Sequence, residues 1–259
     1  MKLRQAISTA EGKQRYVRRL FATIADRYDF ITGFLSYGQD RRWKRRLIQL
    51  ADLQPEDRLL DLACGTGDIV FAGAQSVERA VGLDVTHRML QLARQRSGPA
   101  KGGHYVPGVA GHPCNPRFVT GDMLALPFPD RSFTVVTIGY GLRNVPDLTH
   151  SLEEIRRVLS PHGRVLSLDF NRPSNPIVRA AYLIYLTIVG SALGFVLHGD
   201  PNTYRYIPES IRRYPGSAGV AAMLAREGFE DCRVVPLLGG LMAINTARRR
   251  EIPSADGSL

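Results

Sequence analysis

The spacing of apolar residues changes near residue 57 of this 259-residue chain. Between residues 16 and 50, apolar side chains recur every three or four positions, which predicts two amphipathic helices. Beyond residue 57, short apolar runs alternate with helical patterns. Such an alternation predicts a parallel sheet covered by helices on both faces. The apolar positions of the first two helices are Val17, Leu20, Phe21, Ile24, Trp43, Leu47, Ile48 and Leu50.

The alternation predicts a Rossmann-like α/β fold with a seven-stranded, mostly parallel sheet. The strands are expected at 58–63, 80–85, 117–122, 132–141, 163–170, 232–238 and 240–247. Core helices are expected at 68–75, 87–96, 148–159 and 218–227. The predicted parts are basic N-terminal helices (1–50), an α/β core (51–170), a helical lid inserted after the fifth strand (171–216), the C-terminal part of the same core (217–248) and a tail (249–259).

Two segments depart from the alternation. Residues 98–116 are rich in Gly and Pro, which predicts a long loop. Residues 177–197 are almost continuously apolar and are long enough to span a bilayer. Arg179 near one end, and the position of the segment inside an α/β domain, favour instead a buried or membrane-surface helix that lines an apolar cavity.

Composition narrows the class of protein. A 44% share of hydrophobic residues is ample for a packed core and argues against a disordered chain. Three cysteines, at spacings that match neither a zinc site nor a disulfide framework, indicate a reducing, cytoplasmic setting with free thiols and no metal. The first residues lack the apolar run of a secretion signal, so we expect that the chain is not exported.

The net charge of +10 is concentrated in residues 1–46, which carry twelve Lys or Arg against four Asp or Glu. A basic region of this kind attracts an anionic membrane surface or nucleic acid. A solvated surface without a partner is the third interpretation. Charge alone does not choose among them.

The segment "LLDLACGTGD" runs from a buried strand into a glycine turn. In open parallel sheets a ligand binds beyond the strand ends, where Gly65 and Gly67 would expose backbone amides to it. Val70 stands where a dinucleotide motif has its third glycine, which disfavours a pyrophosphate. Asp84 ends the next strand, where a carboxylate can bind a ribose diol. The pattern predicts S-adenosylmethionine, although the glycines alone would also fit a tight turn without a ligand.

Other residues at the strand ends complete the predicted cofactor site. Asp122 would hold the adenine amino group and Met123 would cover the ring, while Gly139 leaves room for the methionine part. Asp61 and Asp68 flank the turn and would attract the sulfonium or the amino group. Helix capping or a surface position is the alternative for each acid. The expected cofactor contacts are Asp61, Gly65, Thr66, Gly67, Asp84, Val85, Met89, Asp122, Met123 and Gly139.

Five motifs carry a resemblance to a known family. They are "YDFITGFLSYGQDRRWKRR", "LLDLACGTGD", "YGLRNVPD", "RRVLSPHGRVLSLDF" and "TYRYIPESIRRYP". With them, residues 18–247 resemble the ubiquinone/menaquinone biosynthesis C-methyltransferase family, including its plant and cyanobacterial naphthoquinone branch. The resemblance implies a class I methyltransferase fold. It also implies S-adenosylmethionine-dependent C-methylation of a prenylated quinol, a demethylmenaquinol or related benzoquinol, in respiratory or photosynthetic quinone biosynthesis.

The chemistry of that reaction assigns roles to residues near the strand ends. A ring carbon attacks a sulfonium methyl once a phenol of the reduced ring has lost its proton. Because a phenol of pKa about 10 is mostly neutral at about pH 7, the site must stabilise the phenolate or supply a base. We expect Arg143 to stabilise the phenolate and Asn144 to orient the same oxygen. Asp169 is a candidate base, and Tyr140 a candidate ring contact.

The resemblance also implies a substrate side to the site. Tyr204, Arg205 and Tyr206 match the family's substrate-side motif and are expected to close over the ring. Residues 180–197 would line a tunnel for the prenyl tail. His198 is a candidate titrating partner, with a structural role as the alternative.

Departures from the family pattern leave the acceptor open. Ile31 and Thr32 stand where the family usually has Met-Asn, Asp40 where it has His, "SPHG" where it has Lys-Pro-Gly-Gly, and Asp169 where it often has Glu. The alternatives are a methyltransferase of another lipophilic molecule, a nucleic-acid-binding or RNA-modifying protein, and a silent cofactor-binding subunit. Because no RNA-type motif accompanies the basic region, we expect a cytoplasmic enzyme at the inner face of an anionic membrane, without nucleic acid. A homodimer is compatible with the sequence.

Overall fold

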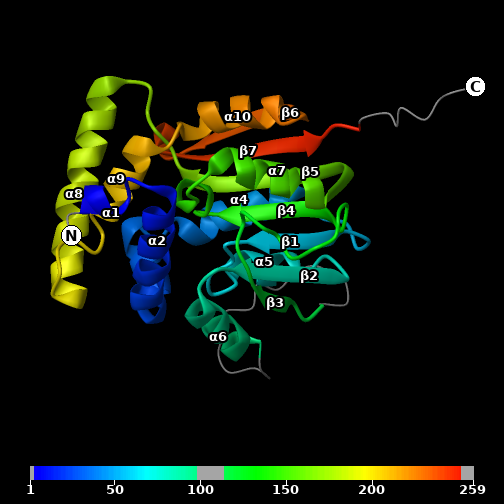
Figure 1. Cartoon of the computed structure of the whole chain (residues 1–259), viewed down its shortest axis with the longest axis horizontal. Helices are drawn as coiled ribbons and strands as arrows, with labels where there is room; N and C mark the ends of the chain where they lie inside the picture. The colour runs from blue at the N-terminus through cyan, green and yellow to red at the C-terminus, as the bar shows by residue number, and fades with distance from the viewer. Residues whose placement is uncertain (1–2, 98–113, 252–259) are drawn as a thin grey trace, which may run out of the picture.

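The computed structural model describes residues 3–97 and 114–251 and contains a central sheet with helices on both faces (Figure 1). Its seven strands lie in the order β3-β2-β1-β4-β5-β7-β6, which confirms the predicted sheet. Strands β1 to β5 pair in parallel, and β7 is antiparallel to both β5 and β6. The strands are β1 (Arg58–Leu62), β2 (Arg79–Asp84), β3 (Arg117–Thr120), β4 (Phe133–Gly139), β5 (Leu159–Phe170), β6 (Phe229–Leu237) and β7 (Met242–Arg249).

Helices precede, connect and follow the strands. The α-helices are α1 (Leu3–Ala6), α2 (Ala10–Ile24), α3 (Tyr28–Leu35), α4 (Asp40–Ala51), α5 (Asp68–Gly73), α6 (His87–Arg96), α7 (Leu148–Val158), α8 (Pro176–His198), α9 (Tyr206–Arg213) and α10 (Gly216–Arg226). Short 3₁₀ helices are η1 (Ala25–Arg27), η2 (Leu142–Asn144) and η3 (Leu238–Gly240).

Alternating side chains of the strands build two hydrophobic cores, one on each face of the sheet. Leu60 and Val136 face the core that is shared with α7 and α10. Their neighbours Leu59 and Val135 face the opposite core, which α4 and α5 complete. This two-fold alternation is the period of side chains along a strand, and burial on both faces explains the continuously apolar strand sequences.

The N-terminal region differs from the predicted pair of helices. The first long helix starts at Ala10 rather than near residue 16, because Thr9 accepts a hydrogen bond from the Gly12 amide and caps the helix. The additional helix α3 separates α2 from α4. The periodicity of the apolar residues did not resolve this short third helix.

The fifth strand also differs from its prediction, because it begins at Leu159 and includes the "SPHG" segment. Its pairing with β4 shifts register between Phe133 and Val135, and His162 adopts a positive φ of 60°. An irregular pairing of this kind accommodates the Pro and Gly of the segment. Of the predicted 98–116 loop, all but the last three residues lie outside the described part of the chain.

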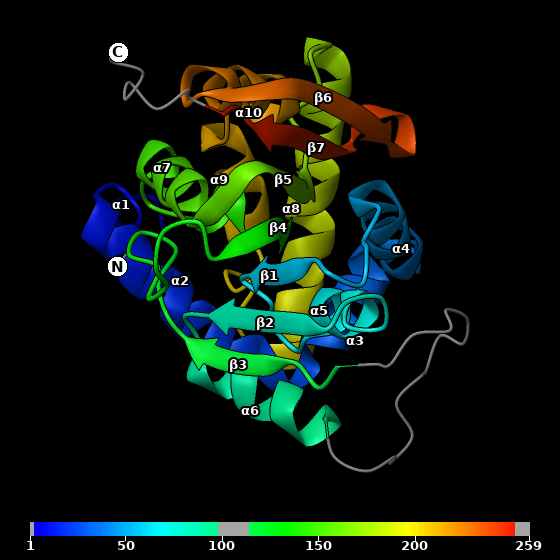
Figure 2. The ribbon, with the colours of Figure 1, turned by 90° about the vertical axis from the view of Figure 1, so that its right-hand side faces the viewer.

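Helices α2 and α8 lie at one end of the sheet, beyond the ends of the parallel strands (Figure 1), and Figure 2 shows them behind the sheet. Within the described residues, α8 is long and apolar enough to cross a membrane, and 22% of its most apolar stretch is buried. The alternative of a buried helix is therefore wrong, because most of α8 is open to solvent. Its inner face packs against α9 and α3.

Candidate functional site

A small cleft of about 80 Å³ lies where β1, β2 and β4 end. It gathers most of the predicted cofactor contacts, which come from strand ends, turns and one helix far apart in the sequence. This is the position at which open α/β sheets bind their ligands. We call it the strand-end cleft. The predicted residues that line it are Gly65, Asp84, Val85, Met89, Asp122, Met123 and Gly139.

Asp84 holds the glycine turn in place. Its Oδ2 accepts a hydrogen bond from the Gly65 amide at 2.9 Å, and its Oδ1 accepts one from the Thr86 amide at 2.7 Å. Burial raises the pKa of Asp84, and these backbone hydrogen bonds oppose the rise. Gly65 has a φ of +54°, in the region that favours glycine. The carboxylate thus both fixes the turn and faces the cleft.

Three predicted cofactor residues do not line the cleft in the described part of the chain. Thr66 donates a hydrogen bond to Asp29 at 2.7 Å. Gly67 has a φ of +92°, and a Cβ there would lie 2.6 Å from the Phe71 ring, so glycine is required for the backbone path. Asp61 is fully buried under the turn, where Thr137 donates to its Oδ1 at 2.8 Å. These residues shape the turn.

The buried Asp61 makes the stability of the protein depend on pH. Burial raises its pKa from 3.8 to about 7, against the hydrogen bond from Thr137. The folded protein binds this proton more tightly than the unfolded chain, so the free energy of unfolding falls as the pH rises from 3.8 to about 7. We expect Asp61→Asn to unfold at a higher temperature than the wild type above that range, with the difference vanishing in acid. Calorimetry across the range tests this, and a difference that does not vary with pH would contradict it.

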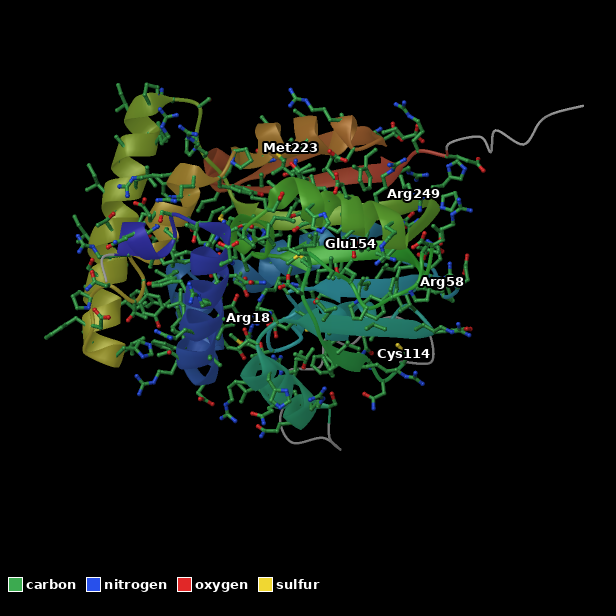
Figure 3. The ribbon with its side chains drawn as sticks, viewed as in Figure 1. Arg18, Arg58, Cys114, Glu154, Met223 and Arg249 are labelled. Atoms are coloured by element: carbon green, nitrogen blue, oxygen red, sulfur yellow. The ribbon has the colours of Figure 1, made fainter. Side chains whose placement is uncertain are left out.

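Helix α2 covers the strand-end cleft, which the sequence did not predict. Gln14, Val17 and Arg18 all line it. Gln14 and Arg18 donate to Oδ2 of Asp122, the latter at 3.4 Å. Arg18 lies on the side of α2 that faces the strand ends (Figure 3). The apolar spacing of α2 indicated an amphipathic helix but not the surface that it covers.

A second, larger cavity of about 560 Å³ adjoins the cleft. We call it the apolar cavity, because nearly all of its walls are hydrophobic or aromatic. Its walls come from α2, α3, α8, α9 and the ends of β5 and β7. Phe21, Tyr28 and Tyr140 line both spaces, so the two share an aromatic wall. A ligand in one space would therefore lie beside a ligand in the other.

Arg143 is the buried charge in the wall of the apolar cavity. Its Nε lies 3.0 Å from Oδ1 of Asp169, and its Nη1 donates to Ser210 at 2.9 Å. The amide of Arg143 also donates to Oδ2 of Asp169 at 3.2 Å. The Phe170 ring lies 4.8 Å from the guanidinium carbon. Ser210, from α9, was not predicted; its only sequence signal is the family-like motif around it.

Asn144 and Asp169 support Arg143 from two sides. Asn144 lines the strand-end cleft, donates to the Tyr140 carbonyl at 2.7 Å, and accepts from Arg143 Nη1 at 3.3 Å. Asp169 does not line either space in the described residues. Burial raises its pKa, and the Arg143 charge opposes the rise. Both of its oxygens are engaged, which suits a residue that positions Arg143.

Tyr140 is held in a strained conformation at the boundary of the two spaces. Its φ of +58° is unusual for an aromatic residue. Its amide donates to the Leu168 carbonyl at 2.7 Å, and its hydroxyl donates to Asp40 at 2.6 Å. Asp40 in turn pairs with Lys44 at 2.6 Å. Asp40, which stands where the similar family has His, thus anchors the Tyr140 ring.

Lys44 also pairs with Asp68, which does not line the strand-end cleft in the described residues. Lys44 Nζ lies 2.8 Å from Asp68 Oδ2, and Arg96 lies 2.7 Å from Asp68 Oδ1. The pKa of Asp68 is about 2, because Lys44 and Arg96 outweigh the burial that would raise it. Both oxygens of the Asp68 carboxylate are therefore paired with cationic side chains.

The residues predicted on the substrate side separate into two groups. Tyr204 and Tyr206 are buried and line the apolar cavity. Arg205 is exposed and donates to Asn202, and it does not line the apolar cavity, so its closure over a ring stays a prediction. His198 lies 2.8 Å from the Tyr204 hydroxyl.

The first half of α8 lines the apolar cavity, and the predicted tunnel for a prenyl tail along residues 180–197 stays a prediction. The residues of α8 that line the cavity are Ile177, Val178, Ala181, Tyr182, Tyr185 and Leu186. The second half of the helix, beyond Leu186, packs against α3 and α9 or faces solvent instead.

The strand-end cleft fits S-adenosylmethionine. Asp84 offers a carboxylate to ribose hydroxyls, and Gly65 brings bare backbone to the same space. Met89 and Met123 supply apolar surface for a base. A Cβ on Gly139 would lie 2.5 Å from Ile69 Cδ1, so a side chain there would require Ile69 to shift. Within the described residues, no cluster of His, Cys, Asp or Glu could hold a metal ion.

Comparison with known proteins agrees with this geometry. The sequence profile of the ubiE/COQ5 methyltransferase family matches residues 9–249. The ubiquinone/menaquinone biosynthesis C-methyltransferase UbiE of Teredinibacter turnerae is 34% identical, over 93% of this chain and 94% of its own length. The demethylmenaquinone methyltransferase of Thermus thermophilus is 38% identical, over 89% of this chain and 100% of its own length.

Solved structures show the same fold at low identity. A methyltransferase of Thermotoga maritima, described as a possible histamine N-methyltransferase, has a TM-score of 0.62 at 17% identity, over 90% of this chain and 100% of its own. One described as a putative S-adenosylmethionine-dependent methyltransferase, from Methanococcus maripaludis, has a TM-score of 0.58 at 16% identity. It covers 90% of this chain and 95% of its own. The predicted class I methyltransferase fold is confirmed.

Proposed function

The chain belongs to the ubiE/COQ5 methyltransferase family, and from that premise we propose that it methylates a ring carbon of a prenylated quinol. The enzyme is an S-adenosylmethionine-dependent methyltransferase. The names of its relatives associate them with ubiquinone and menaquinone biosynthesis. A demethylmenaquinol or a related benzoquinol is therefore the proposed acceptor.

The observation that carries this proposal is the polar inner end of the apolar cavity. Arg143 and Tyr206 both line it, and the buried Tyr206 hydroxyl has no hydrogen-bond partner among the described residues. A buried hydroxyl without a partner costs free energy, which a ligand oxygen would recover. Burial raises the pKa of Tyr206 and the Arg143 charge opposes the rise, so the hydroxyl is a donor near that charge. A polar ring with a hydrophobic tail matches these walls.

The residues around Arg143 would prepare the acceptor. When bound, the cofactor supplies an electrophilic methyl group. The guanidinium would stabilise a quinol phenolate and lower the pKa of that hydroxyl, because it is a fixed positive charge in an apolar wall. A guanidinium does not itself accept the proton. Asn144 would orient the same oxygen, and Asp169 and Ser210 would hold the guanidinium in place.

Transfer of a labelled methyl group tests the proposal. Purified enzyme with labelled S-adenosylmethionine should methylate a short-tailed naphthoquinol or benzoquinol under reductant, and should leave the oxidised quinone unlabelled. The oxidised ring is the control, because it has no phenol to ionise. The proposal would be rejected if both redox forms were labelled equally, or if neither was labelled.

Peripheral contact with an anionic membrane is part of the same proposal. The acceptor is lipophilic, and the basic residues of α2 and α4 include the exposed Arg15, Arg41, Arg42, Arg45 and Arg46. Each such residue near an anionic leaflet contributes about 1 kcal/mol of attraction. Salt-sensitive binding to RNA, with none to anionic vesicles, would favour nucleic acid instead.

A further inference from the structure

We infer that the exposed apolar surface of α3 and α8 docks on a lipid bilayer and admits the acceptor from the membrane into the apolar cavity. The inference rests on the proposed function, because a bilayer-resident acceptor is what needs such a route. We call the residues Phe30, Phe34, Tyr37, Ile177, Ile184 and Ile188 the docking surface.

Helix α8 is apolar on its outer as well as its inner face. Leu183, Leu186 and Leu193 are buried against the protein. On the opposite side, Ile184 and Ile188 are 59% and 65% exposed. A helix that is hydrophobic all round belongs in a protein core or in lipid, and a soluble surface helix has a polar outer face. Water is therefore an unfavourable environment for this outer face.

Side chains that are both exposed and part of the cavity wall mark its mouth. Tyr37, Ile177 and Val178 line the apolar cavity and are 62%, 79% and 45% exposed. Leu238 of η3 shares both properties. The exposed apolar surface is thus continuous with the inside of the cavity. A hydrophobic molecule can pass along it without entering water.

Two tyrosines meet across this mouth. The Tyr37 hydroxyl donates to that of Tyr185, and their rings stack with centroids 6.2 Å apart. Tyr37 follows α3 and Tyr185 lies in α8, so the pair joins the two helices at the cavity wall. Tyrosine is enriched where protein crosses from lipid into headgroups, because its ring is apolar and its tip is polar.

Helix α3 extends the surface beside α8. Ile31 packs in one cluster with Leu193 of α8, which holds the two helices together. Phe30 and Phe34 are 60% and 53% exposed and stack with ring centroids 6.3 Å apart. Most of the large apolar side chains exposed in the described residues belong to α3, α8 and the turn after α3. Concentration of exposed apolar residues on neighbouring elements indicates an interaction surface.

The charges near α8 favour an anionic bilayer as the occupant. The helix contains no Asp or Glu, and its one Arg or Lys is Arg179, near the N-terminus. At the other end, Arg27 donates to the Leu197 carbonyl. The nearby acids Asp26 and Asp29 are paired with arginines of α6, and the exposed Asp200, just after the helix, accepts hydrogen bonds from Asn202. Basic side chains at both ends of an apolar helix match phosphates on either side of a shallow insertion.

The packing of α8 sets how it meets the membrane. Gly190 and Gly194 let the backbones of residues 200–204 approach the helix, and added Cβ atoms would come within 3.3 Å of those backbones. With one face fixed to the protein along most of its length, the helix lies in the membrane surface rather than across it.

Vesicle flotation tests the inference with purified full-length protein. Vesicles of phosphatidylcholine and phosphatidylglycerol should carry the wild type upward. The variant Ile184→Glu/Ile188→Glu should bind about tenfold less, because charges replace inserted side chains. Neither residue lines the cavity, so methylation of a short-tailed quinol without vesicles should stay at the wild-type rate. Methylation of a long-tailed quinol in vesicles should fall about tenfold, in step with the loss of binding.

A matched control places the same substitution elsewhere. Val234 in β6 is also apolar and is 37% exposed, and Val234→Glu should leave flotation unchanged. Equal flotation of the double variant and the wild type would overturn the inference. So would a wild-type dimer that the double variant converts to monomer with vesicle binding unchanged, because a second copy would then cover the surface. If flotation behaves as expected but no quinol is methylated, docking stands and the proposed function fails.

Discussion

Replacing Arg143 with alanine should lower the rate of methyl transfer about a thousandfold, while the Kd for S-adenosylmethionine stays within about twofold. The guanidinium lies in the wall of the apolar cavity and not in the lining of the strand-end cleft. Its loss removes the positive charge that stabilises the phenolate but none of the side chains that line the cleft. Rapid-quench kinetics and calorimetric titration measure the two effects separately.

The ion pair with Asp169 calls for a second variant. Arg143→Ala leaves a buried carboxylate without its partner, which destabilises the fold as well as the reaction. Arg143→Lys keeps the positive charge but loses the branched guanidinium, whose Nη1 also donates to Ser210. This variant should be as stable as the wild type, and its rate of methyl transfer should lie between those of Arg143→Ala and the wild type. Equal weakening of cofactor binding in both variants would show that Arg143 belongs to the cofactor site.

Replacing Asp84 with alanine should raise the Kd for S-adenosylmethionine about a hundredfold, which corresponds to about 2.7 kcal/mol. Two lost interactions contribute to this weaker binding. The ribose hydroxyls lose a charged acceptor, and the Gly65 and Thr86 amides lose the carboxylate that holds the turn. Titration calorimetry with the apoprotein measures the change.

A second substitution separates these two losses. Asp84→Asn keeps one oxygen for the turn and loses the charge, so its Kd should lie between those of alanine and wild type. Wild-type affinity in Asp84→Ala would refute the assignment of the cleft. The Asp84 variants should turn over at nearly the wild-type rate once the cofactor is saturating, in contrast to the Arg143 variants.

The sequence predicted those features that depend on local patterns along the chain. The sheet of seven mostly parallel strands, the glycine turn and the acid at the end of β2 follow from periodicity and from the rule that parallel strands end at one edge. The resemblance added Arg143 and Asn144, whose positions in the walls agree with expectation. Their chemical roles remain predictions.

Contacts between distant segments could not be read from the pattern. Gln14 and Asp122 meet only because α2 folds over the sheet, and no local signal in either segment encodes that packing. The same holds for Ser210 beside Arg143. The exposure of Arg205 could not be predicted either, because a motif fixes the order of side chains along the chain but not the helix face on which each one lies. The start of α9 turns Tyr206 inward and Arg205 outward.

The aromatic wall formed by Phe21, Tyr28 and Tyr140 has a thermodynamic consequence. Because each ring bounds two compartments, a ligand that shifts a ring in one compartment changes the binding free energy in the other. Linkage requires the influence to be mutual: whatever factor the quinol imposes on the affinity for the methyl donor, the donor imposes on the affinity for the quinol. The demethylated cofactor, left behind after transfer, and the methylated product would likewise change each other's affinity by one common factor.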